Sequence, residues 1–479
     1  MSDPRCSTET SREAEVSTDE RADVDRSPEL LLAYYGDDLT GSTAVLEALA
    51  KNGVRTALFF DPPTPDELTG RFADLAAVGV AGRSRSMTPS QMNERLAPAF
   101  EALRALDPEC CHYKVCTTFD SSPEIGSIGH AIDLGQDSFD SPFVPLLIGN
   151  PPLEPLGRYV VFGNLFATQD GEVYRLDRHP IMSNHPVTPM EESDLRRHLC
   201  RQTDRDIGLV DVLDMWGDPA AALERERSDA EVVLFDTLRR AHLEVAGRLL
   251  WSEAEATDGP LFAVGSSAVE YALTGRWQEN GRVPDRDRRG QVDAVDRLLV
   301  MAGSAAPVTA EQIERAVDAG FADVRLETGA LVDPDGVADA RERAVSAAAT
   351  ALENDRSVVL YSARGPEDPV IAETRARAAD LGVDAGERLG VQQGHIVREL
   401  LDSVSVPRVC VAGGDTSGAV CDELEIHALE RLAPIVPGNP LCRATFPEAD
   451  VDGLEVILKG GQVGPRDYFE RVRRGLTHD

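Results

Sequence analysis

Short apolar runs alternate with longer amphipathic stretches along most of the chain, and the alternation begins near the N-terminus. Residues 30–35 form the first apolar run, an amphipathic stretch over 42–52 follows, and a second apolar run covers 54–60. Apolar runs of this length are typical of buried strands, and the amphipathic stretch is typical of a helix. Strand, helix and strand within about thirty residues predict a βαβ unit, and therefore a parallel sheet.

The same alternation continues towards the C-terminus. Apolar runs predict further strands at 75–81, 159–162, 232–235, 261–264, 298–302, 323–326, 358–361 and 409–412. Helical spacing predicts helices at 90–106, 191–201, 238–252, 309–319, 336–353, 388–403 and 419–429. Residues 121–155 and 175–190 are rich in Gly, Pro or charge and are expected to be irregular.

A highly charged segment without periodicity, 276–296, divides the chain and predicts a linker. We therefore expect an α/β protein with two α/β domains, 28–275 and 297–479, with largely parallel sheets and an active site in the cleft between them. Residues 1–27 are polar and acidic, and we expect a disordered tail there.

Composition narrows the classes of partner. The 479 residues carry a formal net charge of −35, so bare nucleic acid would be repelled and is not expected as a partner. No apolar run reaches the length of a membrane span and no signal segment begins the chain, so neither a membrane nor export is expected. The eight cysteines lack zinc-site spacing and predict free thiols in a reducing, cytoplasmic setting. The acid-rich, lysine-poor composition predicts work in a halophilic, high-salt cytosol.

Polar side chains follow the predicted strands of the first half. Asp37 and Asp38 follow the first strand, Arg83 and Arg85 follow the strand at 75–81, and Lys114 and Thr117 close the next strand. Parallel sheets bind ligands at the carboxyl ends of their strands, so these side chains are candidates for one site. The aspartates can equally be a turn and a helix N-cap, and the arginines can equally serve solubility.

In the second half, the apolar run 409–412 ends in Gly413-Gly414-Asp415-Thr416-Ser417-Gly418, which opens a predicted helix. Glycines let a backbone approach a phosphate, and a helix N-terminus presents free N–H groups and a positive dipole end. An ordinary βα turn remains the alternative. Ala419 and Val420 stand where a P-loop needs Lys and Ser or Thr, and neither a dinucleotide fingerprint nor a G-x-S-x-G elbow is present.

Lysine occurs at only three positions, Lys51, Lys114 and Lys459, although the chain has 48 basic residues. A lysine that survives such a bias is a candidate for a role that arginine cannot fill, because lysine is a compact point charge. Lys459 leads an apolar strand into Gly460-Gly461, and Lys114 lies in a short, mostly apolar stretch. Lys51 ends a helix and is read as a C-terminal cation.

Four ordered segments resemble the four-carbon acid sugar kinase family over about residues 29–475. They are Asp37-Asp38-Leu39-Thr40-Gly41, Gly303-Ser304 with Pro307-Val308-Thr309 and Gln312-Ile313, Gly413 to Gly418, and Lys459-Gly460-Gly461. The resemblance implies an N-terminal domain that holds a sugar acid and a C-terminal domain that holds ATP.

Residue by residue, the resemblance implies substrate contacts at Asp38, Arg85, Lys114, Val115, Cys116 and Thr117. It implies ATP contacts at Ser304, Gly413, Gly414, Asp415, Thr416 and Gly461. Lys459 and Gly460, in the last of these glycine turns, are also expected to bind ATP, with Lys459 holding nucleotide phosphates. Asp37 or Asp38 can accept the substrate proton or hold Mg²⁺, so ATP and Mg²⁺ are the expected cofactors. A homo-oligomer is left open.

Two departures bear on the substrate. Where the family usually has Lys-x-Asp-Ser-Thr-x-Arg-Gly, this chain has Lys114-Val115-Cys116-Thr117-Thr118-Phe119-Asp120-Ser121, and Ala306 replaces a frequent serine. The segment 119–126 resembles members that act on oxo-sugar acids such as 3-oxo-isoapionate. The expected activity is ATP-dependent phosphorylation of a four-carbon or branched oxo-sugar acid. A sugar-acid- or nucleotide-sensing binding protein and a nicotinamide-dependent dehydrogenase are the alternatives.

Overall fold

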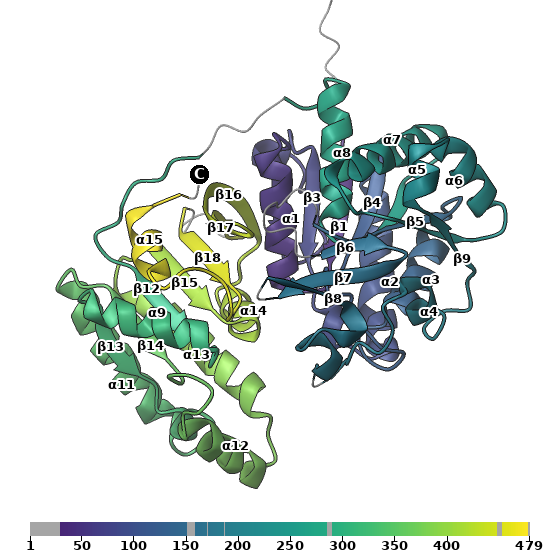
Figure 1. Cartoon of the computed structure of the whole chain (residues 1–479). Helices are drawn as coiled ribbons and strands as arrows, with labels where there is room; N and C mark the ends of the chain where they lie inside the picture. The colour runs from purple at the N-terminus through teal and green to yellow at the C-terminus, as the bar shows by residue number, and fades with distance from the viewer. Residues whose placement is uncertain are drawn as a thin grey trace, which may run out of the picture.

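The computed structural model describes residues 29–150, 159–169, 171–185, 187–284, 290–447 and 453–477 (Figure 1). The tail predicted at 1–27 and the middle of the predicted linker, 285–289, lie outside these ranges. Two α/β halves lie side by side, and the chain crosses between them once, after helix α8 (Ala268–Glu279). None of the described helices is both long and apolar enough to cross a membrane.

The N-terminal half contains eight parallel strands in the order β2-β3-β1-β4-β11-β5-β10-β9. Their bounds are β1 Leu32–Gly36, β2 Thr56–Phe59, β3 Ala77–Ala81, β4 Cys110–Lys114, β5 Val144–Leu147, β9 Ile207–Val210, β10 Val232–Phe235 and β11 Leu261–Gly265. A separate antiparallel sheet joins β6 Tyr159–Phe162, β7 Asn164–Gln169 and β8 Glu172–Arg175. The helices are α1 Leu39–Lys51, α2 Pro89–Ala105, α3 Ile128–Phe139, α4 Leu195–Leu199, α5 Val212–Trp216, α6 Pro219–Arg227, α7 Arg240–Ala256 and α8.

The C-terminal half repeats the parallel arrangement and adds a hairpin. Five of its strands are parallel: β13 Ala322–Arg325, β14 Val358–Tyr361, β12 Leu299–Ala302, β15 Arg408–Ala412 and β18 Glu455–Lys459. The hairpin consists of β16 Ala428–Val436 and β17 Asn439–Thr445, and β17 pairs antiparallel with both β16 and β18. The helices are α9 Pro307–Asp318, α10 Thr328–Leu331, α11 Val337–Glu353, α12 Val370–Leu381, α13 Ala385–Ser403, α14 Gly414–Glu423 and α15 Tyr468–Arg474. The prediction of a two-domain α/β fold with a largely parallel sheet is confirmed.

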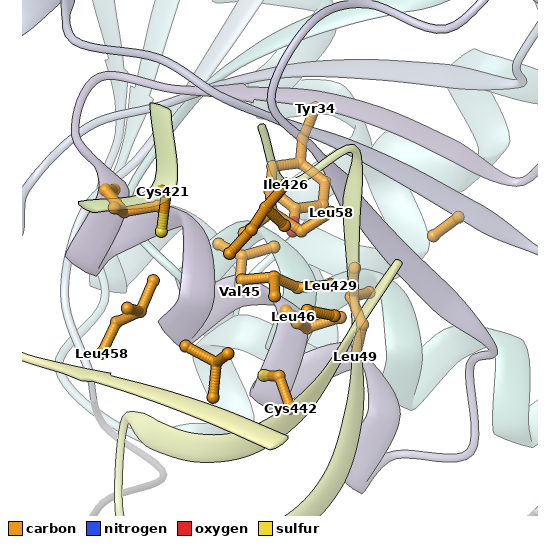
Figure 2. Packing of buried hydrophobic residues seen from close by; sticks show 14 of the residues in the cluster. Tyr34, Val45, Leu46, Leu49, Leu58, Cys421, Ile426, Leu429, Cys442 and Leu458 are labelled. Atoms are coloured by element: carbon orange, nitrogen blue, oxygen red, sulfur yellow. The ribbon is translucent and has the colours of Figure 1, made fainter. Parts of the chain in front are cut away.

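The two halves share one sheet. Strand β16 pairs antiparallel with β2, Leu429 opposite Leu58, and this pairing joins the strands into a continuous sheet of fifteen. Helix α1 packs across the same boundary: its Val45, Leu46 and Leu49 lie in one apolar cluster with residues of the C-terminal half, such as Leu429 and Leu458 (Figure 2). Each fully buried leucine contributes on the order of 1.5–3 kcal/mol, so the two halves are held together by a core as well as by main-chain hydrogen bonds.

Three local predictions were wrong. Residues 121–155, expected to be irregular, contain α3 and β5. Helix α3 is capped by Ser127, whose hydroxyl accepts from the N–H of His130, and it buries an apolar face against the sheet. The helix expected over 419–429 ends at Glu423, because Glu425 turns the chain with a φ of 55° and β16 begins three residues later. The helix expected over 191–201 is only the five residues of α4.

Candidate active site

Asp37 and Asp38 form the turn between β1 and α1, and the backbone there leaves them different roles. The N–H of Asp37 donates to the carbonyl of Lys114 at 2.8 Å, which fixes the turn against β4. Asp38 is the N-cap of α1: its Oδ1 accepts from the N–H of Gly41 at 2.8 Å. Asp37 is buried, whereas the side chain of Asp38 keeps 29% of its exposure. Asp38 is therefore both a cap and the aspartate that reaches solvent.

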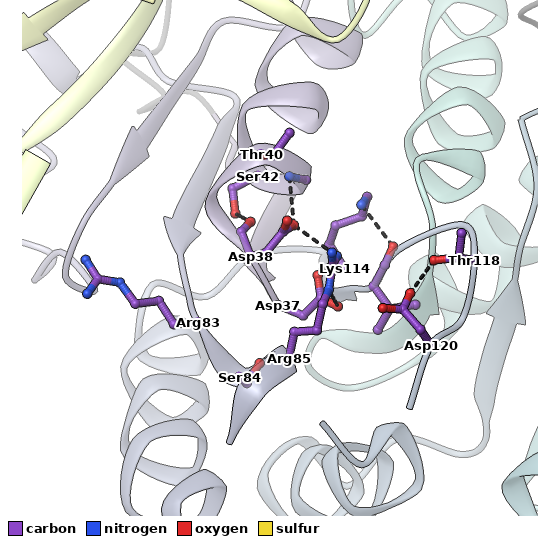
Figure 3. Close-up of polar contacts among 12 residues, drawn as sticks. Asp37, Asp38, Thr40, Ser42, Arg83, Ser84, Arg85, Lys114, Thr118 and Asp120 are labelled. Atoms are coloured by element: carbon purple, nitrogen blue, oxygen red, sulfur yellow. Dashed lines mark hydrogen bonds and ion pairs between the residues drawn. The ribbon is translucent and has the colours of Figure 1, made fainter. Parts of the chain in front are cut away.

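Arg85 binds both carboxylates (Figure 3). Its Nε and Nη2 donate to the two oxygens of Asp37 at 3.1 and 2.9 Å, and Nη2 also lies 3.0 Å from Oδ1 of Asp38. The planar fork of arginine is thus engaged by Asp37. Asp37 consequently acts as a support for Arg85, and Arg83, two residues earlier, extends away from this cluster.

The surroundings of Asp38 make it more basic than an ordinary aspartate. Burial raises the pKa of the Asp38 carboxyl, and the neighbouring Asp37 carboxylate raises it further, while Arg85 and Lys114 oppose both effects. A carboxylate with a raised pKa holds a proton more strongly, which suits Asp38 to accept a proton.

Lys114 ends β4 beside the N-terminus of α1. Its Nζ donates to the carbonyl of Val115 at 2.9 Å. A Cβ at Gly41 would lie 3.1 Å from this Nζ and 2.4 Å from Oδ1 of Asp38, so only glycine fits between the two charges. Val115 itself is fully buried in the core, and the structure brings its carbonyl, but not its side chain, towards the site.

A cavity of about 320 Å³ collects most of the predicted substrate residues, among them Asp38, Arg85, Lys114, Cys116 and Thr117. Its remaining lining consists of residues that were not predicted to contact the substrate: Thr40, Gly41, Ala44, Glu47, Ala48, Lys51, Asn150, Ser267, Tyr271, Pro437 and Gly438. Ser267 could have been found, since Gly265-Ser266-Ser267 also follows an apolar strand. Pro437 and Gly438 could not, because they come from the other half of the chain.

The segment that departs from the family pattern is held rigidly. Phe119 is fully buried with a φ of 56°, a conformation that non-glycine residues adopt rarely. Ser121 lies 3.0 Å from Nε2 of His198, and the amide of Gln202 donates to the same hydroxyl at 3.0 Å. Burial, together with Arg201, lowers the pKa of His198 to about 4, so the imidazole is neutral near pH 7. Cys116 and Thr117, next to this segment, are thereby fixed in the cavity wall.

Three loops of the C-terminal half meet at glycines. A Cβ at Gly461 would lie 2.2 Å from Oγ of Ser304, and one at Gly303 would lie 1.9 Å from Oγ1 of Thr416. Gly413 has a φ of 130°, and its N–H donates to the carbonyl of Lys459 at 2.9 Å. Helix α14 starts directly after this turn, and the first N–H groups of a helix have no partner within it. The predicted ATP residues are therefore brought together at a helix N-terminus suited to a phosphate.

Lys459 stabilises the glycine loop at Gly460 and Gly461. Its side chain is buried, and its Nζ donates to Thr309 Oγ1 and to the carbonyls of Gly460 and Gly461 at 3.0, 3.0 and 3.4 Å. Burial lowers the pKa of the Lys459 ammonium to about 8. Because its hydrogen bonds go to the loop and to Thr309 of α9, Lys459 holds the loop against this helix, and it is not among the residues that line the cleft.

Helix α9 clamps the same loop from its other side. The hydroxyl of Thr309 donates to the carbonyl of Gly461 at 2.7 Å. The amide of Gln312 donates to the carbonyls of Val463, Gly464 and Pro465 at 3.0–3.2 Å. These contacts explain structurally why Thr309 and Gln312 belong to the recognised motif.

The substrate cavity adjoins an interdomain cleft of about 730 Å³, which is lined by Gly414 and Asp415 but by none of the other predicted ATP residues. Asp38, Thr40 and Arg85 line both the smaller cavity and this cleft, and Gly414, Asp415 and Gly418 line its opposite wall. Asp38 thus stands where the two spaces meet. This arrangement suits transfer of a group from a ligand on α14 to a ligand in the cavity.

Comparison with known protein families matches each half of the chain to a different domain family. Residues 32–273 match the sugar-binding N-terminal domain family, and residues 299–469 match the nucleotide-binding C-terminal domain family. The chain belongs to the four-carbon acid sugar kinase family, which combines these two domains.

Two curated relatives illustrate the similarity. The chain is 46% identical to the 3-oxo-isoapionate kinase of Paraburkholderia graminis over 452 residues, covering 93% of this chain and 94% of that protein. It is 31% identical to the 3-oxo-tetronate kinase of Cupriavidus necator, covering 93% and 97%. Two solved structures, from Salmonella typhimurium and Haemophilus influenzae, share the fold with TM-scores of 0.76 and 0.69 at 22% and 21% identity, and cover 93% and 92% of this chain and 99% of each of theirs.

Proposed function

We propose that the protein is a kinase that transfers the γ-phosphoryl group of ATP to a hydroxyl of a small oxo-sugar acid, with 3-oxo-isoapionate as the leading acceptor. The observation that carries the proposal is the position of Asp38, which lines both the cavity with Lys114 and the cleft with the α14 N-terminus. The 46% identity to a 3-oxo-isoapionate kinase supports the choice of acceptor, and the identity to 3-oxo-tetronate kinases makes four-carbon oxo acids the second choice.

In the proposed reaction, the acceptor lies in the cavity with its carboxylate near Lys114 and the outer edge of Arg85. Asp38 orients the attacking hydroxyl and takes its proton as the phosphoryl group arrives. Phosphoryl transfer depends mainly on positioning and on stabilising charge. The N–H groups at the start of α14 and the loops at Ser304 and Gly461 would hold the phosphates.

Mg²⁺ is part of the proposal. Asp38 and Asp415 lie on opposite walls of the cleft, and carboxylate and phosphate oxygens are the ligands that Mg²⁺ prefers. Asp415 would hold the ion together with phosphate oxygens, and the ion would neutralise charge on the transferred group. Asp415 lies in the first turn of α14, where its charge alone would repel phosphates. An ion between Asp415 and the phosphates would explain why an acidic residue stands at this position.

The experiment is an assay of purified protein with ATP, Mg²⁺ and a panel of oxo-sugar acids, followed by ADP release and by ³¹P NMR of the product. We expect acid-dependent ADP release and a new phosphate monoester. Binding of an acid without ADP release would favour a sensing protein, and a change in nicotinamide absorbance would favour a dehydrogenase. The same assay, run with and without molar KCl, tests the expected high-salt, cytoplasmic setting. Light scattering tests whether the protein is a homo-oligomer.

A further inference from the structure

The cavity that holds Lys114 and Asp38 has one wall from the other half of the chain. Pro437 and Gly438 form the turn between β16 and β17, and both line this cavity, whereas the rest of its lining belongs to the N-terminal half. The hairpin of the C-terminal half therefore completes a pocket that is otherwise built by the N-terminal half.

The floor of the cavity is one face of α1. Asp38, Gly41, Ala44, Ala48 and Lys51 line it at helical spacing, so the cavity follows the helix from its N-terminus to its C-terminus. The small side chains in the middle leave room for a ligand. The turn meets the helix here, because a Cβ at Gly438 would lie 4.0 Å from Cβ of Ala44.

Glu47 holds the turn in place. Its side chain is buried, it lines the cavity, and its Oε2 accepts a hydrogen bond from the N–H of Gly438. Such a bond to a carboxylate is stronger than one between neutral groups. Gly438 has a φ of 81°, so the turn depends on glycine at this position. Glu47 lies nine residues after Asp38, a rise of about 14 Å along the helix.

We propose that the Pro437–Gly438 turn sets the length of acceptor that the cavity admits, and that Glu47 is the positioning residue that holds it. This inference rests on the proposed function. The cationic end of the cavity, at Lys114 and Arg85, takes the carboxylate of the acid. The far end, under the turn, takes the uncharged end of the carbon chain. The cavity thus selects short sugar acids against longer ones.

The test compares wild type with Glu47→Ala, Glu47→Gln and the control Arg443→Gln, which changes an exposed residue of the same hairpin. The acceptors are a four-carbon 3-oxo acid, a branched five-carbon 3-oxo acid and a linear six-carbon aldonic acid. Glu47→Ala should raise the KM of the preferred acid about tenfold, the loss expected for a hydrogen bond to a charged group, with the KM of ATP within about twofold. Glu47→Gln, which still accepts the hydrogen bond, should keep the length preference and a KM close to that of wild type.

Wild-type turnover is measured first. If wild type phosphorylates none of the acids, the proposed function is wrong. If it phosphorylates one but Glu47→Ala keeps the wild-type KM and the wild-type order of acceptors, the role of the turn is wrong and the function stands. A loss of kcat with all KM values unchanged, or an equal effect in Arg443→Gln, would also overturn the inference, because a merely structural role would produce it.

Discussion

At the scale of single residues, the site separates two adjacent aspartates that the sequence presents as equals. Asp37 is buried, is bound by the fork of Arg85 and borders only the cleft, whereas Asp38 lines both the cavity and the cleft. The capping bond from Gly41 uses one oxygen of Asp38, and it orients the carboxylate without removing it from the site. One aspartate therefore supports the cation, and the other is available for chemistry.

Asp38→Asn should lower turnover by at least about a hundredfold, the lower range for a positioned general base. Asparagine keeps the size and the capping ability of aspartate but lacks its charge and basicity. We therefore expect the melting temperature to stay close to that of wild type. Steady-state kinetics with a thermal melt provide the check, and a normally folded variant with near wild-type turnover would reduce Asp38 to a cap.

The raised pKa of Asp38 predicts a pH dependence. Burial is the main cause of this rise in the pKa of the carboxyl above that of an ordinary aspartate. Below its pKa the carboxyl is protonated and cannot accept the substrate proton, so kcat/KM should fall as the pH is lowered, and it should do so at a higher pH than for an ordinary aspartate. The pH profile of wild type should show this acid limb, and the residual activity of Asp38→Asn should lack it. An identical limb in both proteins would assign it to another group.

Lys459→Met should raise the KM of ATP about tenfold and leave that of the sugar acid within about twofold. The ammonium holds the carbonyls of Gly460 and Gly461, and a loop without this support would present its N–H groups poorly to phosphates. Methionine retains most of the buried volume, which limits the loss of packing. Kinetics with each substrate varied in turn decide the matter, and a larger effect on the acid than on ATP would contradict the assignment.

The sequence predicts much of this residue-scale picture. Side chains directly after apolar runs, such as Asp38, Lys114 and Gly413, can be placed at the carboxyl edge of a sheet by periodicity alone. The partners of those side chains cannot be predicted, because they depend on which strands are neighbours: the pairing of Arg85 with Asp37 follows from β3 lying next to β1. The contacts of Lys459 with Thr309 and with the carbonyls of Gly460 and Gly461 are likewise not revealed by any spacing in the sequence.

At the scale of elements, α1 serves two surfaces. One face lines the cavity, and the opposite face packs Val45, Leu46 and Leu49 into the cluster shared by both halves (Figure 2). The helix is thus a structural link between the substrate site and the domain boundary.

Leu46→Ala should lower the free energy of unfolding by about 3 kcal/mol, the usual cost of a cavity at a fully buried leucine. Because the cluster includes residues of both halves, we expect them to unfold together. Urea titrations followed by far-UV circular dichroism and by tryptophan fluorescence should give coincident transitions. The tryptophans, Trp216, Trp251 and Trp277, all lie in the N-terminal half, so an earlier fluorescence transition would show that the halves unfold separately.

The β16–β17 hairpin shows where sequence patterns fail at this scale. It contains Pro434, Pro437 and Pro440, and proline argues against a strand in the middle of a sheet. The structure accommodates the prolines with register shifts in β16 and by placing Pro434 opposite Pro440. The surrounding strands decide the conformation here, and these strands come from both halves of the chain.

At the scale of the whole molecule, a charge pair also spans the cleft. Arg83 of the N-terminal half donates to both oxygens of Asp422 at 2.5 Å and to the carbonyl of Gly418 at 3.3 Å. Both partners lie on α14, whose N-terminus faces the nucleotide cleft. About half of each side chain is exposed, so the pair adds at most about 1 kcal/mol to stability.

Arg83→Met should therefore leave the melting temperature nearly unchanged but lower kcat/KM for ATP about threefold at low salt, since about 0.7 kcal/mol of interdomain attraction is lost. Salt screens exposed charges, so the difference from wild type should disappear in molar KCl. Kinetics at the two salt concentrations test this, with Arg71→Met as a matched control. Arg71 pairs with Glu430 across the same domain boundary but away from the cleft. A difference that persists at high salt would exclude an electrostatic cause.

The continuous sheet also has a consequence for synthesis of the protein on the ribosome. The pairing of β2 with β16 brings together positions such as Arg55 and Glu430, which are 375 residues apart. At ordinary rates of translation, the edge of β2 waits about twenty to seventy seconds for its partner strand. During that time the nascent N-terminal half presents an unpaired apolar strand, which is a template for pairing with another chain. The growing chain is therefore a natural client for a chaperone that covers this edge until β16 has been made.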